Sequence, residues 1–305
     1  MAELLNFQKI PKTDYFSDLL SGMRYSSYTR WSGFLLPELS KNDICLDSKL
    51  LDEFKFYTDI KITGRKDFQS LFYMSLSEAV ADNVKILYAG IDCSLCGKCA
   101  APSEFISAVE EVKLKTSGSI DLRPVLAINS SLGNNLFLAE TFIENRNFSG
   151  VVLGGGNFFL KDEKHLYEKI FSSARRAGLK TEISCLAMAR PDDLRFALET
   201  FRPDFVKDIF PMIFDEEILD FIKQTKICVE FTPFVHSPLK DAKLKKYKFM
   251  RRLFDSGVQI RLCTGSLLLL KKSLSEFAME LCGLEIFSEE EIKNLLAISN
   301  KPSAA

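Results

Sequence analysis

Three closely spaced cysteines are candidate metal ligands in this sequence of 305 residues. Cys93, Cys96 and Cys99 are separated by two residues each and follow directly on a predicted strand. With Cys185 or Cys263, which end other predicted strands, three or four thiolates could hold zinc or an iron–sulfur cluster. Because no second closely spaced pair accompanies them, we favour ordinary reduced thiols and keep metal binding as the alternative.

Histidine is scarce, with only His165 and His236 in the whole chain. A catalytic zinc ion usually takes three protein ligands, among which imidazole is prominent, so two separate histidines do not make such a site. His165 falls in the first turn of a predicted helix, where we expect it on the surface.

A glycine run, Gly154–Gly156, follows another predicted strand. It lacks the Gly-Lys-Ser/Thr ending of a phosphate-binding P-loop and the spacing of a dinucleotide fingerprint. We therefore expect a turn that needs positive φ at the end of the strand. If the backbone N–H groups of Gly155 and Gly156 are accessible, they could donate hydrogen bonds to a purine-like ring.

The elements that position these residues alternate along the chain. Eight short apolar runs, most of them separated by segments with helical periodicity, occupy residues 12–16, 84–91, 121–128, 149–154, 179–184, 204–208, 227–232 and 258–263. Strands that alternate with helices favour a parallel sheet, and eight such units favour an α/β fold of the (β/α)8 TIM-barrel type. In such a barrel the carboxyl ends of the strands form the active-site face, which would place the cysteine cluster at the mouth.

The helical segments have recognisable ends. Apolar residues recur at spacings of three and four in Asp67–Asn83, Lys164–Ala177 and Lys246–Ser256. Gly178 and Gly257 follow the last two segments and are typical of the left-handed turn after a helix. Ser288 and Glu291 have the spacing of a capping box, which predicts a final helix from this point.

The segment Pro11–Arg24 resembles the opening of the adenosine deaminase family of metal-dependent amidohydrolases, Pro-Lys-Ala-Glu-Leu-His-Leu-His-Leu followed by an acidic-Gly-Ser-Leu-Arg run. Phe16 and Asp18 stand at its two metal-binding histidine positions. Gly150–Asn157 is similar to the family's Gly-Ile-Asp-Leu-Ala-Gly-Asp-Glu, and only Gly155 carries over, as a position of close backbone approach. Landmarks continue in the family's order to residue 300, but none falls in residues 25–65.

The later landmarks of this resemblance lack the family's chemistry as well. Where the family has Thr-Val-His-Ala-Gly-Glu, Ser184 replaces a ligand histidine and Ala187 replaces the acid/base glutamate. Asp208 stands at the catalytic histidine of Arg-Ile-Gly-His-Gly, and Gly265 and Ser266 stand at two functional aspartates. The resemblance therefore implies the family's barrel without its zinc ligands or its proton-transfer groups.

Two functions follow as hypotheses. We favour a pseudoenzyme without a cofactor that binds a purine nucleoside or nucleotide, or that serves as a regulatory or partner subunit in a homo-oligomer or with another protein. Besides Gly155 and Gly156, its ligand contacts would include Asp18, Asp208 and His236, because the resemblance places His236 just after the seventh strand. The alternative is an enzyme with a rebuilt site, in which Asp18 and Asp208 hold a hard cation or the cysteines hold zinc or an iron–sulfur cluster.

Charge and hydropathy limit the partners. A net charge of −1 and a pI near 6.2 give no electrostatic footprint for nucleic acid. The basic run Lys240–Arg252 is interleaved with apolar residues at helical spacing, so we expect it to be the solvated face of a helix. No apolar segment approaches the ~20 residues of a membrane span, and no signal peptide is recognised, so we expect a cytoplasmic protein. The chain is expected to be one domain, residues 1–305, with a disordered tail at 301–305.

Overall fold

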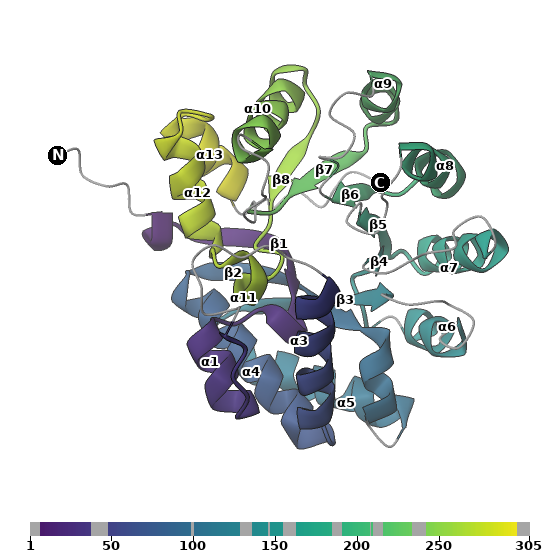
Figure 1. Cartoon of the computed structure of the whole chain (residues 1–305). Coiled ribbons are helices and arrows are strands. Elements are labelled where there is room, and N and C mark those ends of the chain that lie inside the picture. Colours follow the sequence, from purple (N-terminus) through teal and green to yellow (C-terminus); the bar gives the residue numbers. More distant parts are fainter. Residues whose placement is uncertain are drawn as a thin grey trace.

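The structure, a computed structural model, describes residues 7–37, 48–98, 101–128, 136–145, 147–154, 163–184, 191–207, 209, 216–233 and 242–297. Eight parallel strands lie in one sheet in the order of the sequence. The strands are β1 (Lys12–Asp18), β2 (Val84–Asp92), β3 (Asp121–Ile128), β4 (Gly150–Leu153), β5 (Lys180–Ser184), β6 (Phe205–Lys207), β7 (Cys228–Phe231) and β8 (Ile260–Leu262). Figure 1 shows them at the centre of the molecule, with helices around the outside, which confirms the predicted (β/α)8 barrel.

The first and last strands meet to bring the sheet to near closure. Ser17 and Gly265 form an isolated parallel bridge between the two ends. The amide of Gly265 donates a hydrogen bond of 2.8 Å to the carbonyl oxygen of Phe16, and the amide of Asp18 donates one of 2.5 Å to the carbonyl oxygen of Gly265. These bonds hold the segment after β8 against β1.

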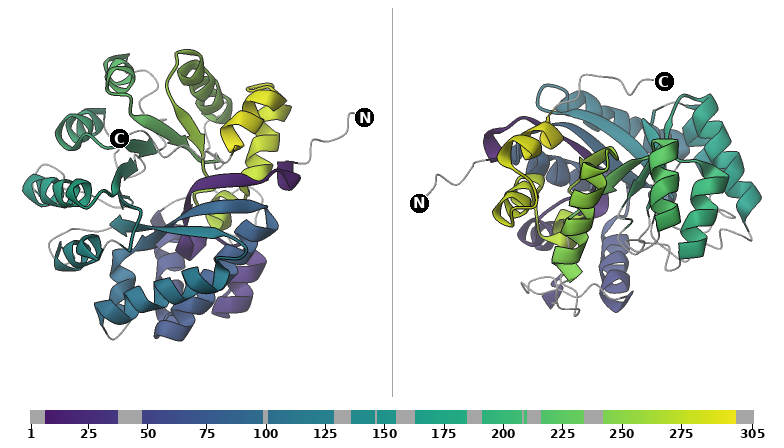
Figure 2. Two further views of the ribbon diagram at one scale, coloured as in Figure 1. Left: turned by 180° about the vertical axis from the view of Figure 1, so that it is seen from behind. Right: turned by 90° about the horizontal axis from the view of Figure 1, so that it is seen from above.

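Helices between successive strands lie on the outside of the ring, as the two views of Figure 2 show, and the last three helices of the following list come after β8. They are α1 (Tyr25–Ser32), α3 (Ser48–Lys61), α4 (Arg65–Ala81), α5 (Pro102–Thr116), α6 (Leu136–Glu144), α7 (Lys164–Arg176), α8 (Pro191–Phe201), α9 (Glu216–Thr225), α10 (Ala242–Asp255), α11 (Leu267–Leu270), α12 (Leu274–Gly283) and α13 (Glu289–Leu296). Helices α1 and α3 fall in residues 25–65, where the sequence offered no landmark. Among the described residues, no helix combines the length and the hydropathy of a transmembrane span.

The predicted helix ends are confirmed. Gly178 and Gly257 have φ values of 78° and 80°. The side chain of Ser288 accepts a hydrogen bond from the amide of Glu291, whose carboxylate accepts one from the amide of Ser288. The expectation for the basic run is wrong at Lys246, because this side chain is buried against the barrel and donates a 2.9 Å hydrogen bond to the carbonyl oxygen of Thr232.

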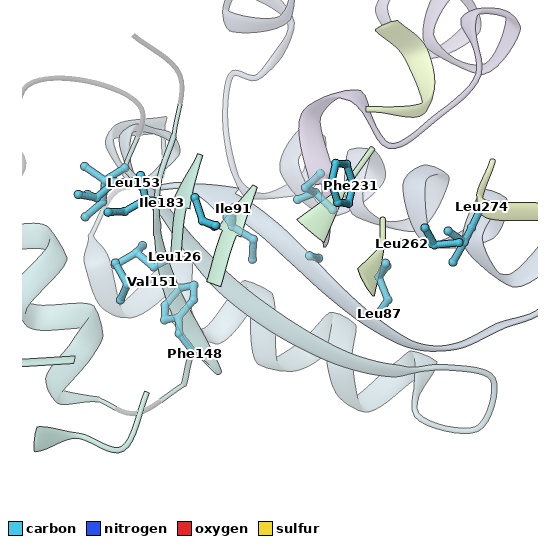
Figure 3. Packing of buried hydrophobic residues seen from close by; sticks show 14 of the residues in the cluster. Leu87, Ile91, Leu126, Phe148, Val151, Leu153, Ile183, Phe231, Leu262 and Leu274 are labelled. Carbon is cyan, nitrogen blue, oxygen red and sulfur yellow. The ribbon is translucent and has the colours of Figure 1, made fainter. Parts of the chain in front are cut away.

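The main hydrophobic core lies between the strands and the surrounding helices. Figure 3 shows the outward-facing strand residues that build it, among them Leu87, Ile91, Leu126, Val151, Leu153, Ile183, Phe231 and Leu262. Successive side chains of a strand point to opposite faces, so the residues between these positions point into the barrel. The barrel interior, called the lumen below, is therefore lined by a different set of side chains.

Candidate functional site

Charged side chains line much of the lumen. TIM-barrel interiors are usually packed with branched apolar residues, which here form only a small cluster on part of the wall. That cluster contains Phe16, Val125, Ala127, Val152 and Cys263. The inward positions of β5, β6 and β7 carry instead Glu182, Lys207 and Glu230, all of them buried.

Lys207 reaches across the lumen from β6. Its Nζ lies 3.0 Å from Oε1 of Glu182 on the neighbouring strand and 3.0 Å from the ring centroid of Phe16 on β1. Burial lowers the pKa of Lys207, but the negative charges of Glu182 and Glu230 outweigh burial and leave the pKa above its ordinary value. The amine therefore stays protonated at neutral pH, and the residue places a positive charge inside the barrel.

Phe16 faces the lumen because β1 is irregular. Asp14 pairs with Leu87 and Ser17 pairs with Ala89, so β1 has two residues between these pairs where β2 has one. This extra residue makes a bulge in β1. As a result, the consecutive rings of Tyr15 and Phe16 both contact residues of the lumen. A Cβ atom at Gly90 on β2 would lie 2.5 Å from Cζ of Phe16, so the phenyl ring takes the space that a side chain on β2 would need.

Glu230 is the second carboxylate of the lumen. Its Oε2 accepts a hydrogen bond from the thiol of Cys263, with the sulfur 3.7 Å away, and its Oε1 lies 3.8 Å from Nη1 of Arg261. Burial raises the pKa of Glu230 well above its ordinary value, and the nearby charge of Glu182 raises it further, while Lys207 and Arg261 oppose both effects. Glu230 therefore binds a proton far more readily than an exposed glutamate.

A layer of rings and guanidinium groups lies below this cluster, toward the amino ends of the strands. The guanidinium carbon of Arg261 lies 4.2 Å from the ring centroid of Tyr15 and 4.4 Å from that of Phe205. Tyr15 stacks on Tyr88, whose hydroxyl accepts a 2.7 Å hydrogen bond from Arg123. This layer separates the charged cluster from the amino-terminal face of the barrel.

Two aspartates end β1 and β2 at the opposite, carboxyl-terminal mouth. Asp18 accepts hydrogen bonds from the amide of Leu20 (3.1 Å) and the hydroxyl of Ser21 (3.2 Å), and Asp92 accepts one from the amide of Ser94 (2.8 Å). Burial raises the pKa of Asp18 to about 6, and the nearby charge of Asp92 contributes to the rise. Both carboxylates thus hold the turns that follow their strands.

Three further residues at positions of the family's metal or catalytic groups have structural roles or lie within the strand wall. Ser184 is buried at the end of β5. Gly265 has a φ of 67°, and a Cβ there would lie 2.7 Å from Cγ2 of Thr232, so backbone conformation and space both favour glycine. The hydroxyl of Ser266 accepts a hydrogen bond of 3.1 Å from the amide of Leu269 and caps α11.

Two of the three cysteines after β2, Cys93 and Cys96, are buried thiols. Cys93 and Cys96 lie in the 3₁₀ segment Cys93–Lys98 and are both inaccessible to solvent. Burial raises the pKa of Cys93 to about 12, and Asp92 and Cys96 add to the rise. Because the thiolate is the form that binds metals, this environment opposes a metal on Cys93.

Several residues of the sequence predictions fall outside the described residues, so their roles stay predictions. These residues are Cys99, Gly155, Gly156, Cys185, Ala187, Asp208 and His236. His165 is described and lies exposed on α7, as expected.

The described lumen does not fit the zinc ion that the family resemblance implies. Phe16 has no lone pair to donate, and the ammonium of Lys207 lies beside its ring. A divalent cation in the same space would meet a like charge. Within the described ranges, no group of three or more His, Cys, Asp or Glu side chains is arranged to hold a metal ion.

No sequence motif marked Glu182, Lys207 or Glu230 as a site residue. The available signal was the position of each charge within a short predicted strand, clearest at Glu230, which lies between Val229 and Phe231. A charged residue at an inward position of a barrel strand is costly unless it is paired, so the three charges together indicated a common site.

The comparisons with known proteins agree with this architecture. No protein-family model matches the chain. A putative adenosine/adenine deaminase of Treponema pallidum is 26% identical over 306 residues, which cover 98% of this chain and 100% of that protein.

Solved structures are similar over nearly the whole fold. The apo N6-methyl-AMP deaminase of Arabidopsis thaliana has a TM-score of 0.75 at 15% identity, covering 96% of this chain and 92% of that one. The Arabidopsis protein ADAL complexed with GMP has a TM-score of 0.76 at 17% identity, covering 95% and 91%. The fold is a (β/α)8 barrel of the kind found in these deaminase structures. The full-length similarity to a putative adenosine/adenine deaminase agrees with the adenosine deaminase resemblance of the sequence motifs.

Proposed function

We propose that this protein is a cytoplasmic member of the adenosine deaminase family that binds a purine nucleoside or nucleotide at the mouth of its barrel and does not deaminate it with zinc. Its role would be regulatory, or that of a partner subunit in a homo-oligomer or with another protein. The observation that carries the proposal is the pair formed by Lys207 and Phe16 in the lumen.

The chemistry of this pair supports the loss of hydrolysis. Zinc-dependent hydrolysis needs a metal-bound water whose pKa falls to about 7 and a group that transfers protons to the leaving amine. Phe16 cannot ligate a metal ion, and the ammonium of Lys207 opposes a second cation. By the family resemblance, Ser184 and Ala187 stand where a ligand and the acid/base group would be.

Two arguments support a purine ligand: the ligands of similar proteins, and the place where (β/α)8 barrels usually bind their ligands. One similar structure is a complex with GMP, and another similar protein deaminates N6-methyl-AMP. In (β/α)8 barrels ligands bind at the carboxyl ends of the strands, and the ring layer of this barrel lies toward the opposite, amino ends. Asp18 and Asp92 stand there as hydrogen-bond acceptors.

The test combines binding with turnover. Titration calorimetry with GMP, AMP, adenosine and inosine should detect binding of at least one of them, with cytidine as the control ligand. Adenosine and N6-methyl-AMP should remain unchanged after long incubation, with and without added zinc. Zinc-dependent formation of inosine or IMP would overturn the proposal and favour an enzyme with a rebuilt site. If none of the purines binds, the proposed purine-binding function is wrong.

A further inference from the structure

We propose that the lumen is a cation-binding site whose resident cation is the protein's own ammonium group, on Lys207. When that side chain is cut back to alanine, a free primary alkylammonium ion of matching length is expected to bind in its place. The inference does not depend on whether the mouth binds a purine.

The first part of the site is its pair of carboxylates. Glu182 is 6% exposed and Glu230 is 2% exposed, and they lie on the strands either side of β6. Oε1 of Glu182 lies 3.0 Å from Nζ of Lys207 without the geometry of a hydrogen bond. A buried carboxylate is costly unless a positive charge is close, so this wall of the lumen favours a cation over a neutral group.

The second part of the site is the aromatic face opposite the carboxylates. The ring of Phe16 presents its face to Nζ at 3.0 Å from the centroid, which is the arrangement that attracts cations to aromatic rings. The irregularity of β1 turns this ring inward, and Gly90 leaves the space for it. The bulge in β1 and the glycine at residue 90 together allow the ring of Phe16 to lie against the ammonium group.

Glu182 and the ring of Phe16 contact the ammonium from different sides of the barrel, and Glu230 adds a nearby charge from β7. Glu182 is on the strand next to Lys207, whereas Phe16 is on β1, which does not pair with β6. An ordinary ion pair between neighbouring strands needs no third partner across the lumen. A carboxylate on one side of the ammonium and an aromatic face on another form the kind of site that selects a small cation.

The test uses Lys207→Ala and n-propylammonium chloride, because alanine removes three carbons and the amine, which is the propylammonium ion. We expect propylammonium to raise the melting temperature of this variant by roughly 5 °C at about 100 times its dissociation constant. The native protein should not respond, because its site is filled. 1-Propanol, a neutral molecule of the same size, and sodium chloride at equal ionic strength should leave the variant unchanged. Equal stabilisation by 1-propanol, or no response of the folded variant to propylammonium, would overturn the proposal.

A second set of variants covers the case in which Lys207→Ala does not fold. Lys207→Met fills the same space without the charge, so it should melt below the native protein. Adding Glu182→Gln and Glu230→Gln should restore much of the loss, because the carboxylates then no longer need a cation. A Lys207→Met protein as stable as the native one, or a loss that the two glutamines do not restore, would show that the lumen does not select a cation.

Discussion

The contact between Gly90 and Phe16 gives a sharp test of the packing of the lumen. A Cβ at residue 90 would lie 2.5 Å from Cζ and 2.8 Å from Cε2 of the ring, whereas carbon atoms normally approach to about 3.5–4.0 Å. The ring would have to move by about 1 Å, and the ammonium of Lys207 lies directly over its face. Overpacking of this kind typically costs about 1–3 kcal/mol, so we expect Gly90→Ala to lower the free energy of unfolding by about 2 kcal/mol.

The matched background is Phe16→Leu, because leucine lacks the Cε and Cζ atoms that the new methyl group would meet. In that background Gly90→Ala should cost less than about 1 kcal/mol, which gives a coupling of about 1–2 kcal/mol between the two positions. Urea unfolding of the four proteins measures this coupling, provided that the denaturant slope stays constant. Gly118→Ala, where a Cβ meets no atom within 4 Å, is the control substitution. The same cost for Gly90→Ala in both backgrounds would show that the ring of Phe16 does not limit the space at residue 90.

Three other predictions concern the surroundings of the lumen. Burial raises the pKa of Asp14 to about 7, so the folded state binds the proton more tightly than the unfolded state, and the contribution of Asp14 to stability falls as pH rises from about 4 to about 7. The free energy of unfolding of the native protein, relative to Asp14→Asn, should therefore fall by at most about 4 kcal/mol across that window, and a difference that does not change with pH would contradict the pKa. Arg261→Ala should lower the free energy of unfolding by about 2 kcal/mol, because it removes contacts with two rings and Glu230. Arg123→Ala, at a more exposed position, should lower it by less than about 1 kcal/mol. Equal losses for the two variants in urea unfolding would contradict this ranking. Ser266→Ala should cost about 1 kcal/mol through loss of the cap on α11, whereas Ser266→Asp should retain the cap and produce no deamination, and inosine formation by the latter would argue against a structural role for residue 266.

The fold was predictable because its signals are local and repeated. Residues 121–128 were predicted as a strand and form β3 with the same bounds, and Gly178 and Gly257 end their helices with positive φ. These features depend on alternation of apolar runs and on the special conformations of glycine, both of which can be read from neighbouring residues. The capping box at Ser288 is local in the same way.

The lumen was not predictable in the same way because its contacts join distant residues. Phe16 was recognised only as a missing ligand, since nothing near it in the sequence indicates that its ring lies beside an ammonium group 191 positions later. The irregular pairing of β1 that turns the ring inward involves β2 as well. Lys246 was assigned to a solvated helix face because the sequence does not show that a strand-end carbonyl oxygen accepts its hydrogen bond.

The most direct test of the central claim is the metal content of the native protein. Protein prepared without oxygen and without chelators, from cells supplied with zinc, should contain far less than one equivalent of zinc or iron by mass spectrometry of the elements. This result is expected because the cation of the lumen is the ammonium group of Lys207. One tightly bound equivalent of either metal, retained through gel filtration, would contradict the account.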